Sequence, residues 1–472
     1  MTIYEKFRSS SLDIEPVGLF CGPQRSNYPC TPSGSRIIAW STEVEGMHFC
    51  QVPELGDTVF VVNPSAAPED CVYPVANSLK QFIGLICSCR SVEAIANAYQ
   101  WSRFCFHTRT ASAASGMKTR SVLGALENIY HPEKISDPYE TITTLQSSFD
   151  YDTIPLQDKY LKDRRVRPNG SQWFVNFDTD WGEPCNKGAA AKELAVNRVF
   201  HWYGERWRVP SIYLSENGII VDTYTEVPHE AILGYSQKWA DRQENTLSIP
   251  EKLSRDLENP LAVPASGSLA INSKVFASRK TFLAVWNPYS EPSGNIRSAL
   301  KHYELDRNKG YLFRRDCFLR KGSLNNIRTI DFTLSAQPVP VPGPCFTAPP
   351  CGKSTTFRHP QTNLTHTLTV ISENQEALEP NFLSNHPCCY TKLHYTLAPA
   401  LQSGMLRVCD SATGDPWDGS SQILDQAIKN ERPPASGHIA FSSLRYAPAE
   451  SVQWQYLFKQ KLRQDIHVRL LP

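Results

Sequence analysis

The sequence predicts an α+β protein with an amino-terminal antiparallel sheet carrying helices and a β-rich, sandwich-like second half. Three observations favour this class. Short β-branched and aromatic runs separated by turn residues fill positions 36–76. The apolar period then changes from two residues to 3.6, which indicates helices. Thirty-five prolines, many of them between apolar runs, must stop strands or sit at sheet edges, and they point to a β-rich second half.

Length and composition narrow the class further. A chain of 472 residues is too long for one ordinary core, so we expect two or three domains. The 48 Lys and Arg residues against 47 Asp and Glu residues leave a formal charge of +1, which disfavours a dedicated nucleic-acid binder. The start MTIYEKFRSS has no apolar signal region, and no run of about 18 apolar residues is present. We therefore expect a soluble, cytoplasmic protein without a membrane partner.

The first domain is expected to end near residue 164. Residues 1–30 are predicted to be an irregular lead-in, and four strands then form one meander at 36–40, 47–52, 58–62 and 71–76. A helix follows, because Leu79, Phe82 and Ile86 lie on one apolar stripe. Ser78 and Gln81 have the spacing of a capping box at its start. Further helices are predicted at 91–101, 119–131 and 138–149.

The second half is predicted to follow a linker at 165–191, where the composition changes. An α+β domain is expected at 192–340 and a β-rich domain at 341–472, divided by the proline-rich residues 338–350. We expect a helix at 228–242, and strands at 199–204, 209–215, 218–227, 329–335 and 365–372. Residues 451–458 and 465–471 are predicted to form a closing strand pair.

No metal, cofactor or catalytic residue is predicted. His386, Cys388, Cys389 and His394 lie within nine residues, but a structural zinc needs paired ligands two to four residues apart and a second such pair. Adjacent cysteines do not fit that pattern, and the chain has no CxxC. The fourteen cysteines are expected to be free thiols. The chain also lacks GxSxG, HExxH, GxGxxG and the GxxxxGK[ST] phosphate loop.

Charged pairs and runs are interpreted as ordinary surface. The pairs Asp150/Asp152 and Asp178/Asp180 have the spacing of metal–phosphate loops in nucleotide-sugar enzymes, yet no parallel nucleotide-binding sheet is visible. The basic runs 162–167 and 314–321 are interpreted as solvated faces rather than phosphate contacts. Tryptophans in turn-rich segments are interpreted as lids over cores, with partner hot spots as the alternative: Trp173, Trp181, Trp202, Trp207, Trp286 and Trp417.

Residues 36–88 resemble the SMI1/KNR4-like, or SUKH, fold. In that family a strand leads into a segment of the form vA-x-S-F-x-x-F-L-x-x-L, and residues 75–86 of this chain are VANSLKQFIGLI. Leu79 and Ile83 are apolar replacements within it. The resemblance implies a non-catalytic binding module, since many such proteins look like immunity proteins that neutralise toxins and others act as scaffolds. The neutral charge and the large β-rich half depart from the usual pattern of immunity modules.

The whole chain is also similar to uncharacterised proteins of anaerobic Gram-positive gut bacteria. Residues 357–370, FRHPQTNLTHTLTV, and 441–448, FSSLRYAP, carry this second resemblance. It implies no activity.

The function expected from these observations is that of a cytoplasmic, multidomain protein that binds a protein partner without catalysis. Trp40, His48 and Tyr73 are predicted to line a partner-binding groove, with ordinary packing as the alternative. A hydrolase or carbohydrate-acting enzyme with its site in the β-rich half is the second hypothesis, in which Asp178, Asp180 and Trp181 would hold a sugar. A structural or regulatory subunit without a cleft is a third.

Overall fold

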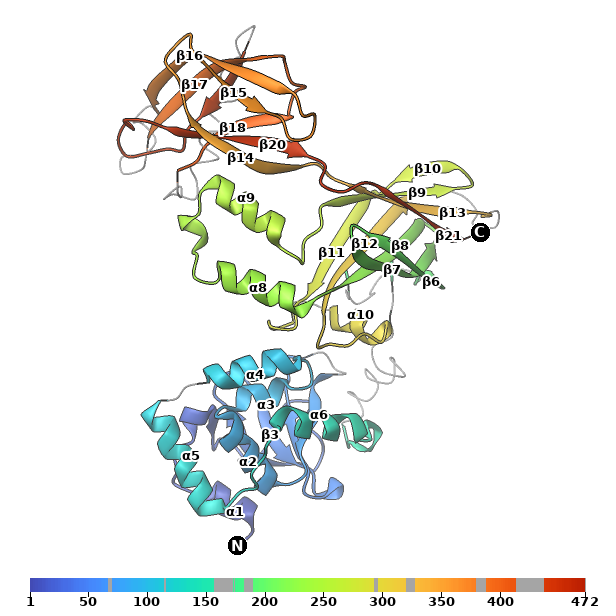
Figure 1. The fold of residues 1–472 in the computed structure, drawn as a ribbon. Coiled ribbons are helices and arrows are strands. Elements are labelled where there is room, and N and C mark those ends of the chain that lie inside the picture. Colours follow the sequence, from blue (N-terminus) through green and yellow to red (C-terminus); the bar gives the residue numbers. More distant parts are fainter. Residues whose placement is uncertain are drawn as a thin grey trace. The chain divides into compact units, whose positions relative to one another are not determined.

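The computed structural model divides the chain into two compact units (Figure 1). The first unit contains Met1–Lys192 and Leu283–Tyr311, and the second contains Glu193–Phe282 and Leu312–Pro472. Helices together with five antiparallel sheets confirm the predicted α+β class with a β-rich carboxy-terminal half. The structure describes residues 1–66, 70–113, 116–156, 173, 175–181, 190–292, 296–319, 327–378, 388–412 and 437–471.

The first unit is built on a five-stranded antiparallel meander in the order β1-β2-β3-β4-β5. Its strands are β1 (Leu19–Phe20), β2 (Arg36–Ser41), β3 (His48–Gln51), β4 (Val59–Val62) and β5 (Val72–Ala76). The four predicted strands are confirmed. The irregular lead-in is corrected, because residues 1–30 also contain β1 and the helix α1 (Ile3–Arg8). Thr2 and Glu5 form a capping box that begins α1.

Helices cover one face of this sheet. Val61 and Val75 from the strands pack with Phe82 and Ile86 from α2 in the main core of the unit. The opposite face carries a smaller core in which Phe60 and other strand residues meet residues 154 and 156. The helices are α2 (Leu79–Cys89), α3 (Val92–Asn97), α4 (Arg103–Ser112), α5 (Met117–Tyr130) and α6 (Pro138–Ser148), with short 3-10 turns at Glu15–Val17, Pro53–Leu55 and Tyr151–Thr153.

The start of α2 differs in one detail from the prediction. The Ser78 hydroxyl accepts a hydrogen bond from the Gln81 N–H at 3.1 Å, as a cap should. The Gln81 side chain, however, accepts from the N–H of Asn77 at 2.7 Å instead of that of Ser78. The reciprocal half of the capping box is therefore displaced by one residue, and it still satisfies a backbone donor ahead of the helix.

Residues 283–292 and 296–311, which we call the strap, belong to the first unit although they lie inside the range 192–340 that the sequence suggested as one domain. The strap begins within β11 (Lys280–Trp286), contains α10 (Ile296–His302) and ends within β12 (Gly310–Leu319). Ile296, Ala299 and Leu300 are its buried apolar residues on α10.

The second unit begins with two antiparallel sheets. One has the order β11-β12-β8-β7-β6 and the other the order β10-β9-β13-β21. Their remaining members are β6 (Lys192–Trp202), β7 (Glu205–Ser215), β8 (Gly218–Val227), β9 (Ala265–Ile271), β10 (Lys274–Ala277), β13 (Ile330–Ala336) and β21 (Ile466–Leu471). The helices α8 (His229–Trp239) and α9 (Ile249–Glu258) follow β8, with a 3-10 turn at Glu244–Thr246 between them.

The rest of the second unit is a sandwich of two sheets. One sheet is β14-β20-β18 and the other is β15-β16-β17-β19, and Phe357, Leu393 and Trp454 share a core between them. The strands are β14 (Val339–Thr347), β15 (Ser354–Arg358), β16 (Thr365–Ala377), β17 (Cys389–Ala398), β18 (Leu406–Asp410), β19 (His438–Phe441) and β20 (Gln453–Gln460).

The predicted closing strand pair is wrong. β20 pairs with β14 and β18, whereas β21 pairs with β13 in a different sheet. β21 alternates as predicted, whereas Tyr456, Leu457 and Phe458 of β20 are buried in succession, and alternation in any case does not select the partner strand. The proline-rich strand β14 lies at the edge of its sheet, as expected for residues without a backbone N–H.

The basic run at 314–321 is also corrected, because two of its arginines are buried on β12 and are not a solvated face. Arg315 donates to both carboxylate oxygens of Asp222 at 2.8 Å each. Arg314 donates to both oxygens of Asp316 at 2.6 and 2.7 Å. All four side chains are at most 3% exposed. The predicted basic run at 162–167 lies outside the described residues.

Candidate functional site

Trp40 and His48, two of the predicted partner-binding residues, are neighbours on β2 and β3 with ring centroids 4.7 Å apart. Both are buried. The Trp40 indole N–H donates to the Pro23 carbonyl at 2.8 Å. His48 Nδ1 donates to the Gly46 carbonyl at 2.8 Å, so in the neutral ring Nε2 accepts from the Thr31 hydroxyl at 3.2 Å. Burial lowers the pKa of His48 and favours this neutral form.

Tyr73, the third predicted residue, is not on the same face of the sheet. It packs against the main core under the helices, whereas Trp40 belongs to the smaller core on the other face. Its hydroxyl donates to Asp70 at 2.5 Å, and its ring stacks on Tyr99 at 4.2 Å. The structure therefore does not bring the three residues into one groove. That they bind a partner stays a prediction, and packing accounts for each of them.

The acids and tryptophan of the enzyme hypothesis lie in the first unit and not in the β-rich half. Asp180 accepts a hydrogen bond from the Trp181 N–H at 2.6 Å, and Trp181 is buried beside Trp173. Asp150 accepts from the Asp152 N–H at 3.1 Å and so caps a 3-10 turn, in agreement with the interpretation of that pair as a helix end.

The other sequence candidates have structural surroundings as well. The Cys388 and Cys389 sulfurs are 4.0 Å apart, and His386 lies outside the described residues. Within the described ranges no three His, Cys, Asp or Glu side chains are grouped to hold a metal ion. Burial confirms Trp202, Trp207 and Trp286 as lids over cores, and Trp417 lies outside the described residues. Among the described helices, none has the length and apolar character to cross a bilayer.

A pocket of about 310 Å³ in the first unit is the candidate site, and we call it the acidic pocket. The connection from β2 to β3 forms one side, α3 and the turn after it form another, and the strap completes the wall. Its lining residues are Ser41, Glu43, Val44, Met47, Val92, Glu93, Asn97, Gln100, Trp101, Glu291 and Pro292.

Two carboxylates in the acidic pocket, those of Glu43 and Glu93, form no ion pair with any residue that the structure describes. Partial burial raises the pKa of Glu43, and the negative charge of Glu93 raises it further. In the part of the chain that the structure describes, neither carboxylate forms an ion pair. Glu291, by contrast, is paired with Arg109. Glu93 is held in place because Ser91 caps α3 by accepting from the Glu93 N–H at 3.1 Å.

The rest of the acidic pocket is lined by apolar side chains and by two side-chain amides that already form hydrogen bonds. Trp101 and Met47 back the pocket wall and are almost fully buried, and Val44 and Pro292 are its half-buried apolar residues. Asn97 donates to the Glu93 carbonyl at 2.9 Å, and Gln100 donates to Asn97 Oδ1 at 2.7 Å. The pocket thus combines apolar walls with two carboxylates that form no ion pair within the described ranges, a combination that suits a cation on an apolar stem.

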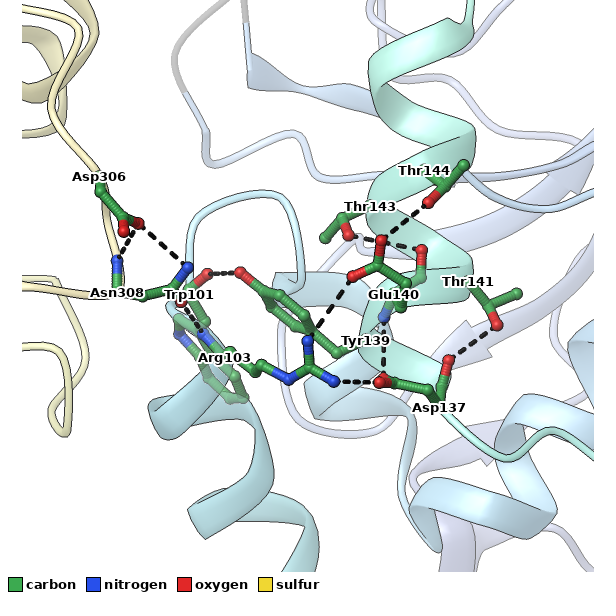
Figure 2. A network of polar contacts seen from close by, with 10 residues as sticks. All are labelled: Trp101, Arg103, Asp137, Tyr139, Glu140, Thr141, Thr143, Thr144, Asp306 and Asn308. Carbon is green, nitrogen blue, oxygen red and sulfur yellow. Dashed lines mark hydrogen bonds and ion pairs between the residues drawn. The ribbon is translucent and has the colours of Figure 1, made fainter.

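A polar network fixes the pocket wall at Trp101 (Figure 2). The Tyr139 hydroxyl of α6 donates to the Trp101 carbonyl at 3.2 Å. Arg103 at the start of α4 forms ion pairs with Asp137 and Glu140 at the start of α6. Asn308 of the strap accepts from the Arg103 N–H at 2.9 Å. The first turns of two helices and the strap are thereby joined around Trp101.

Sequence reasoning did not select the residues of the acidic pocket. Trp101 was expected at the end of a helix, but α3 ends at Asn97 and Trp101 lies in the turn before α4. The signal that could have shown this is Ser102, which caps α4 by accepting from the Cys105 N–H at 3.0 Å. No family model, curated protein or solved structure matches the chain.

Proposed function

We propose that the protein is a non-catalytic, SUKH-like binding module whose acidic pocket receives a basic side chain of a protein partner. The single observation that carries this proposal is the pair Glu43 and Glu93, two carboxylates of one pocket that form no ion pair within the described residues, whereas Arg109 at the same pocket is engaged by Glu291. Removing charge from water is costly when no opposite charge compensates for it. A bound cation relieves that cost and the repulsion between Glu43 and Glu93, so the two carboxylates favour such a ligand.

A lysine or arginine side chain fits the walls as well as the charges. Its methylene stem can lie along the half-buried Val44 and Pro292 of the wall while its charged head reaches the two carboxylates. Hydrogen bonds to charged groups typically contribute about 1.5–3 kcal/mol. One such anchor, surrounded by weaker contacts, is enough to make a hot spot in a protein interface.

The fold supports the family part of the proposal. The antiparallel meander ends in β5 and passes through Val75, Ala76 and the cap Ser78 into α2, which is the strand-to-helix order of the SUKH resemblance. An immunity-like or scaffolding role follows from that resemblance. A cytoplasmic location is part of the proposal, and the free cysteines of the described chain support it.

No specific observation favours the enzyme hypothesis. Carboxylates in the sandwich are engaged by neighbours: Asp410 pairs with Arg445 at 2.7 Å, and Glu373 accepts from the Trp454 indole at 3.0 Å. Glu376 accepts from the Tyr390 hydroxyl at 2.8 Å. These bonds explain the acids as parts of the fold, and the hypothesis stays an untested prediction.

The test compares two charge-reversed forms of the full chain as baits in a lysate of the source organism. Glu43→Lys with Glu93→Lys changes the acidic pocket. Glu45→Lys with Glu54→Lys makes the same charge change at exposed residues outside it. We expect a protein that wild type and control retain to fall at least about tenfold on the pocket variant. Equal retention by all three baits would contradict the proposal.

A further inference from the structure

Arg297 of the strap contacts a carboxylate, an amide and an aromatic ring of the first unit. Arg297 pairs with Asp70 at 2.5 Å and donates to the Gln100 side-chain oxygen at 2.9 Å. Its guanidinium lies 5.0 Å from the ring centroid of Tyr99, which in turn stacks on Tyr73. Tyr73 also donates to the second oxygen of Asp70. Two aromatic rings and a carboxylate are therefore oriented by one another around a single guanidinium.

A second arginine of the strap is seated nearby in the same manner. The Arg307 guanidinium lies 5.3 Å from the ring centroid of Tyr139 and donates to the Tyr99 carbonyl at 3.2 Å. The Trp286 indole donates to the Arg307 carbonyl at 2.8 Å and fixes the backbone there. Tyr99 thus contacts both arginines, through its ring and through its carbonyl.

These contacts distinguish arginine from lysine. The planar guanidinium of Arg297 donates in two directions, to Asp70 and Gln100, while its face lies over Tyr99. A lysine ammonium cannot form a planar fork and stack on a ring at the same time. A cation over an aromatic ring typically contributes about 0.5–2 kcal/mol, depending on how far it is desolvated.

The chemistry of this contact is that of an interface between proteins. Arginine and tyrosine are enriched among residues that carry binding energy at protein interfaces. Contacts between parts of one chain often resemble transient interfaces. The Arg297 and Asp70 side chains keep 27% and 25% of their surface exposed, so water can replace their pairing at moderate cost.

We propose that Asp70, Tyr73, Tyr99, Gln100 and Tyr139 form an arginine-recognition surface, which the strap occupies in this structure and which binds an arginine-bearing segment of a protein partner when the strap leaves. This inference rests on the proposed binding function and names the chemistry of the partner. The surface adjoins the acidic pocket, because Gln100 lines the pocket and also accepts from Arg297.

The strap also shows what such a partner segment should look like. Ile296, Ala299 and Leu300 follow the spacing of one apolar helix face, and Arg297 lies beside the first of them. Arg307 follows ten residues after Arg297. The expected partner is a short amphipathic helix with one arginine in its first turn and a second arginine beyond its end.

The experiment uses the full chain and a fluorescently labelled peptide with the sequence of residues 296–311. The variant Arg297→Asp with Arg307→Asp removes both seated arginines and places a negative charge against Asp70, which weakens the hold of this surface on the strap. We expect the peptide to bind this variant at least about tenfold more tightly than wild type, in which the surface is occupied. A peptide with both arginines replaced by lysine should lose at least about tenfold in affinity for the same variant.

The proposal would be overturned if the peptide bound the variant and wild type with equal affinity. It would also be overturned if the lysine peptide bound the variant as tightly as the arginine peptide, or if the arginine peptide did not bind a folded variant. Circular dichroism and the thermal midpoint report whether the variant folds. If it does not fold, the single change Arg297→Gln replaces it with the same expected direction. The peptide assay uses only the purified chain and the peptide, whereas the test of the acidic pocket uses a lysate. A negative result in one assay therefore does not imply a negative result in the other. Adding Glu43→Lys and Glu93→Lys to the chain that carries Arg297→Asp and Arg307→Asp should leave its affinity for the peptide unchanged.

Discussion

At the scale of single residues, burial assigns roles that side-chain chemistry alone leaves open. His48 is polar and titratable, yet it lies between Trp40 and Thr31 with both ring nitrogens hydrogen-bonded. Arg314 and Arg315 are adjacent on β12, so their side chains point to opposite faces, and each finds a buried carboxylate. The sequence shows which side chains are titratable or charged, and only the surroundings show that His48 favours its neutral form and that both arginines are buried against carboxylates.

The pH dependence of stability should report His48. Its folded pKa lies below the usual 6.5, so the unfolded chain binds a proton that the folded chain refuses. This contribution to the unfolding free energy is complete above about pH 6.5 and is lost below it, by at most about 1.4 kcal/mol per pH unit. Urea unfolding at about pH 7.5 and about pH 5.5 measures it. The difference between wild type and His48→Gln should shrink on acidification.

Comparing wild type with His48→Gln separates the effect of His48 from that of other groups whose protonation also makes the unfolding free energy depend on pH. The raised pKa of Glu43 makes the folded state bind more protons just above the usual carboxyl pKa, so its contribution falls as pH rises there. His359 has a lowered pKa and acts in the same direction as His48. Both groups are present in wild type and variant, so their effects cancel. A difference that does not change with pH would refute the role given to His48.

The buried pair Arg315 and Asp222 should be costly to break and less costly to replace. Asp222→Ala leaves the Arg315 guanidinium buried without this carboxylate, and we expect a loss of about 3–5 kcal/mol in unfolding free energy. The double variant Asp222→Leu with Arg315→Met should recover most of that loss. Chemical denaturation of the three proteins measures both effects. A double variant as unstable as the single one would argue against uncompensated charge as the cause.

At the scale of elements, strong local signals were sufficient where each element buried a regular face. The four strands from β2 to β5 and the helix α2 follow from alternation and from one apolar stripe. α4 was missed because only Cys105 and Phe106 of its ten residues are buried, which gives too weak a period to detect. α1 was missed because six residues contain less than two turns.

The Ser78 cap of α2 should make a measurable contribution to the free energy of unfolding. Ser78→Ala removes the acceptor for the Gln81 N–H, and we expect a loss of about 1 kcal/mol in unfolding free energy. Ser147→Ala is the matched control, because this exposed hydroxyl donates to the Thr144 carbonyl within α6 and caps no helix start. Its effect should stay within about 0.5 kcal/mol. If the two variants had the same urea midpoint, the Ser78 hydroxyl would not be the reason why α2 begins at Leu79.

At the scale of the whole molecule, the first unit is discontinuous in sequence. Residues 283–311 complete it although the chain first passes through strands of the second unit. The Ser102 hydroxyl donates to the Pro288 carbonyl, and Asn308 accepts from the Arg103 N–H, so the strap supplies partners for the start of α4. A chain that stops at residue 192 therefore lacks part of its own fold.

The strap should stabilise such a shortened chain when it is added back. We expect residues 1–192 alone to have a lower thermal midpoint than the same chain with a peptide of residues 283–311. At a peptide concentration about 100 times its Kd, binding adds about 2.7 kcal/mol to the unfolding free energy. Scanning calorimetry with and without the peptide measures this. A peptide carrying Arg297→Asp is the control and should shift the midpoint much less.

The sequence by itself determined the α+β class, the meander strands β2 to β5 and the capped start of α2, because these depend on periods and caps within about a dozen residues. Only the tertiary structure decided which strands pair, that Arg315 is buried, and that positions 43, 93, 101 and 291 line one pocket. These outcomes depend on contacts between residues far apart in the chain. Local spacing carries no information about such contacts, since the pairing is chosen by the burial and hydrogen bonding of the whole fold.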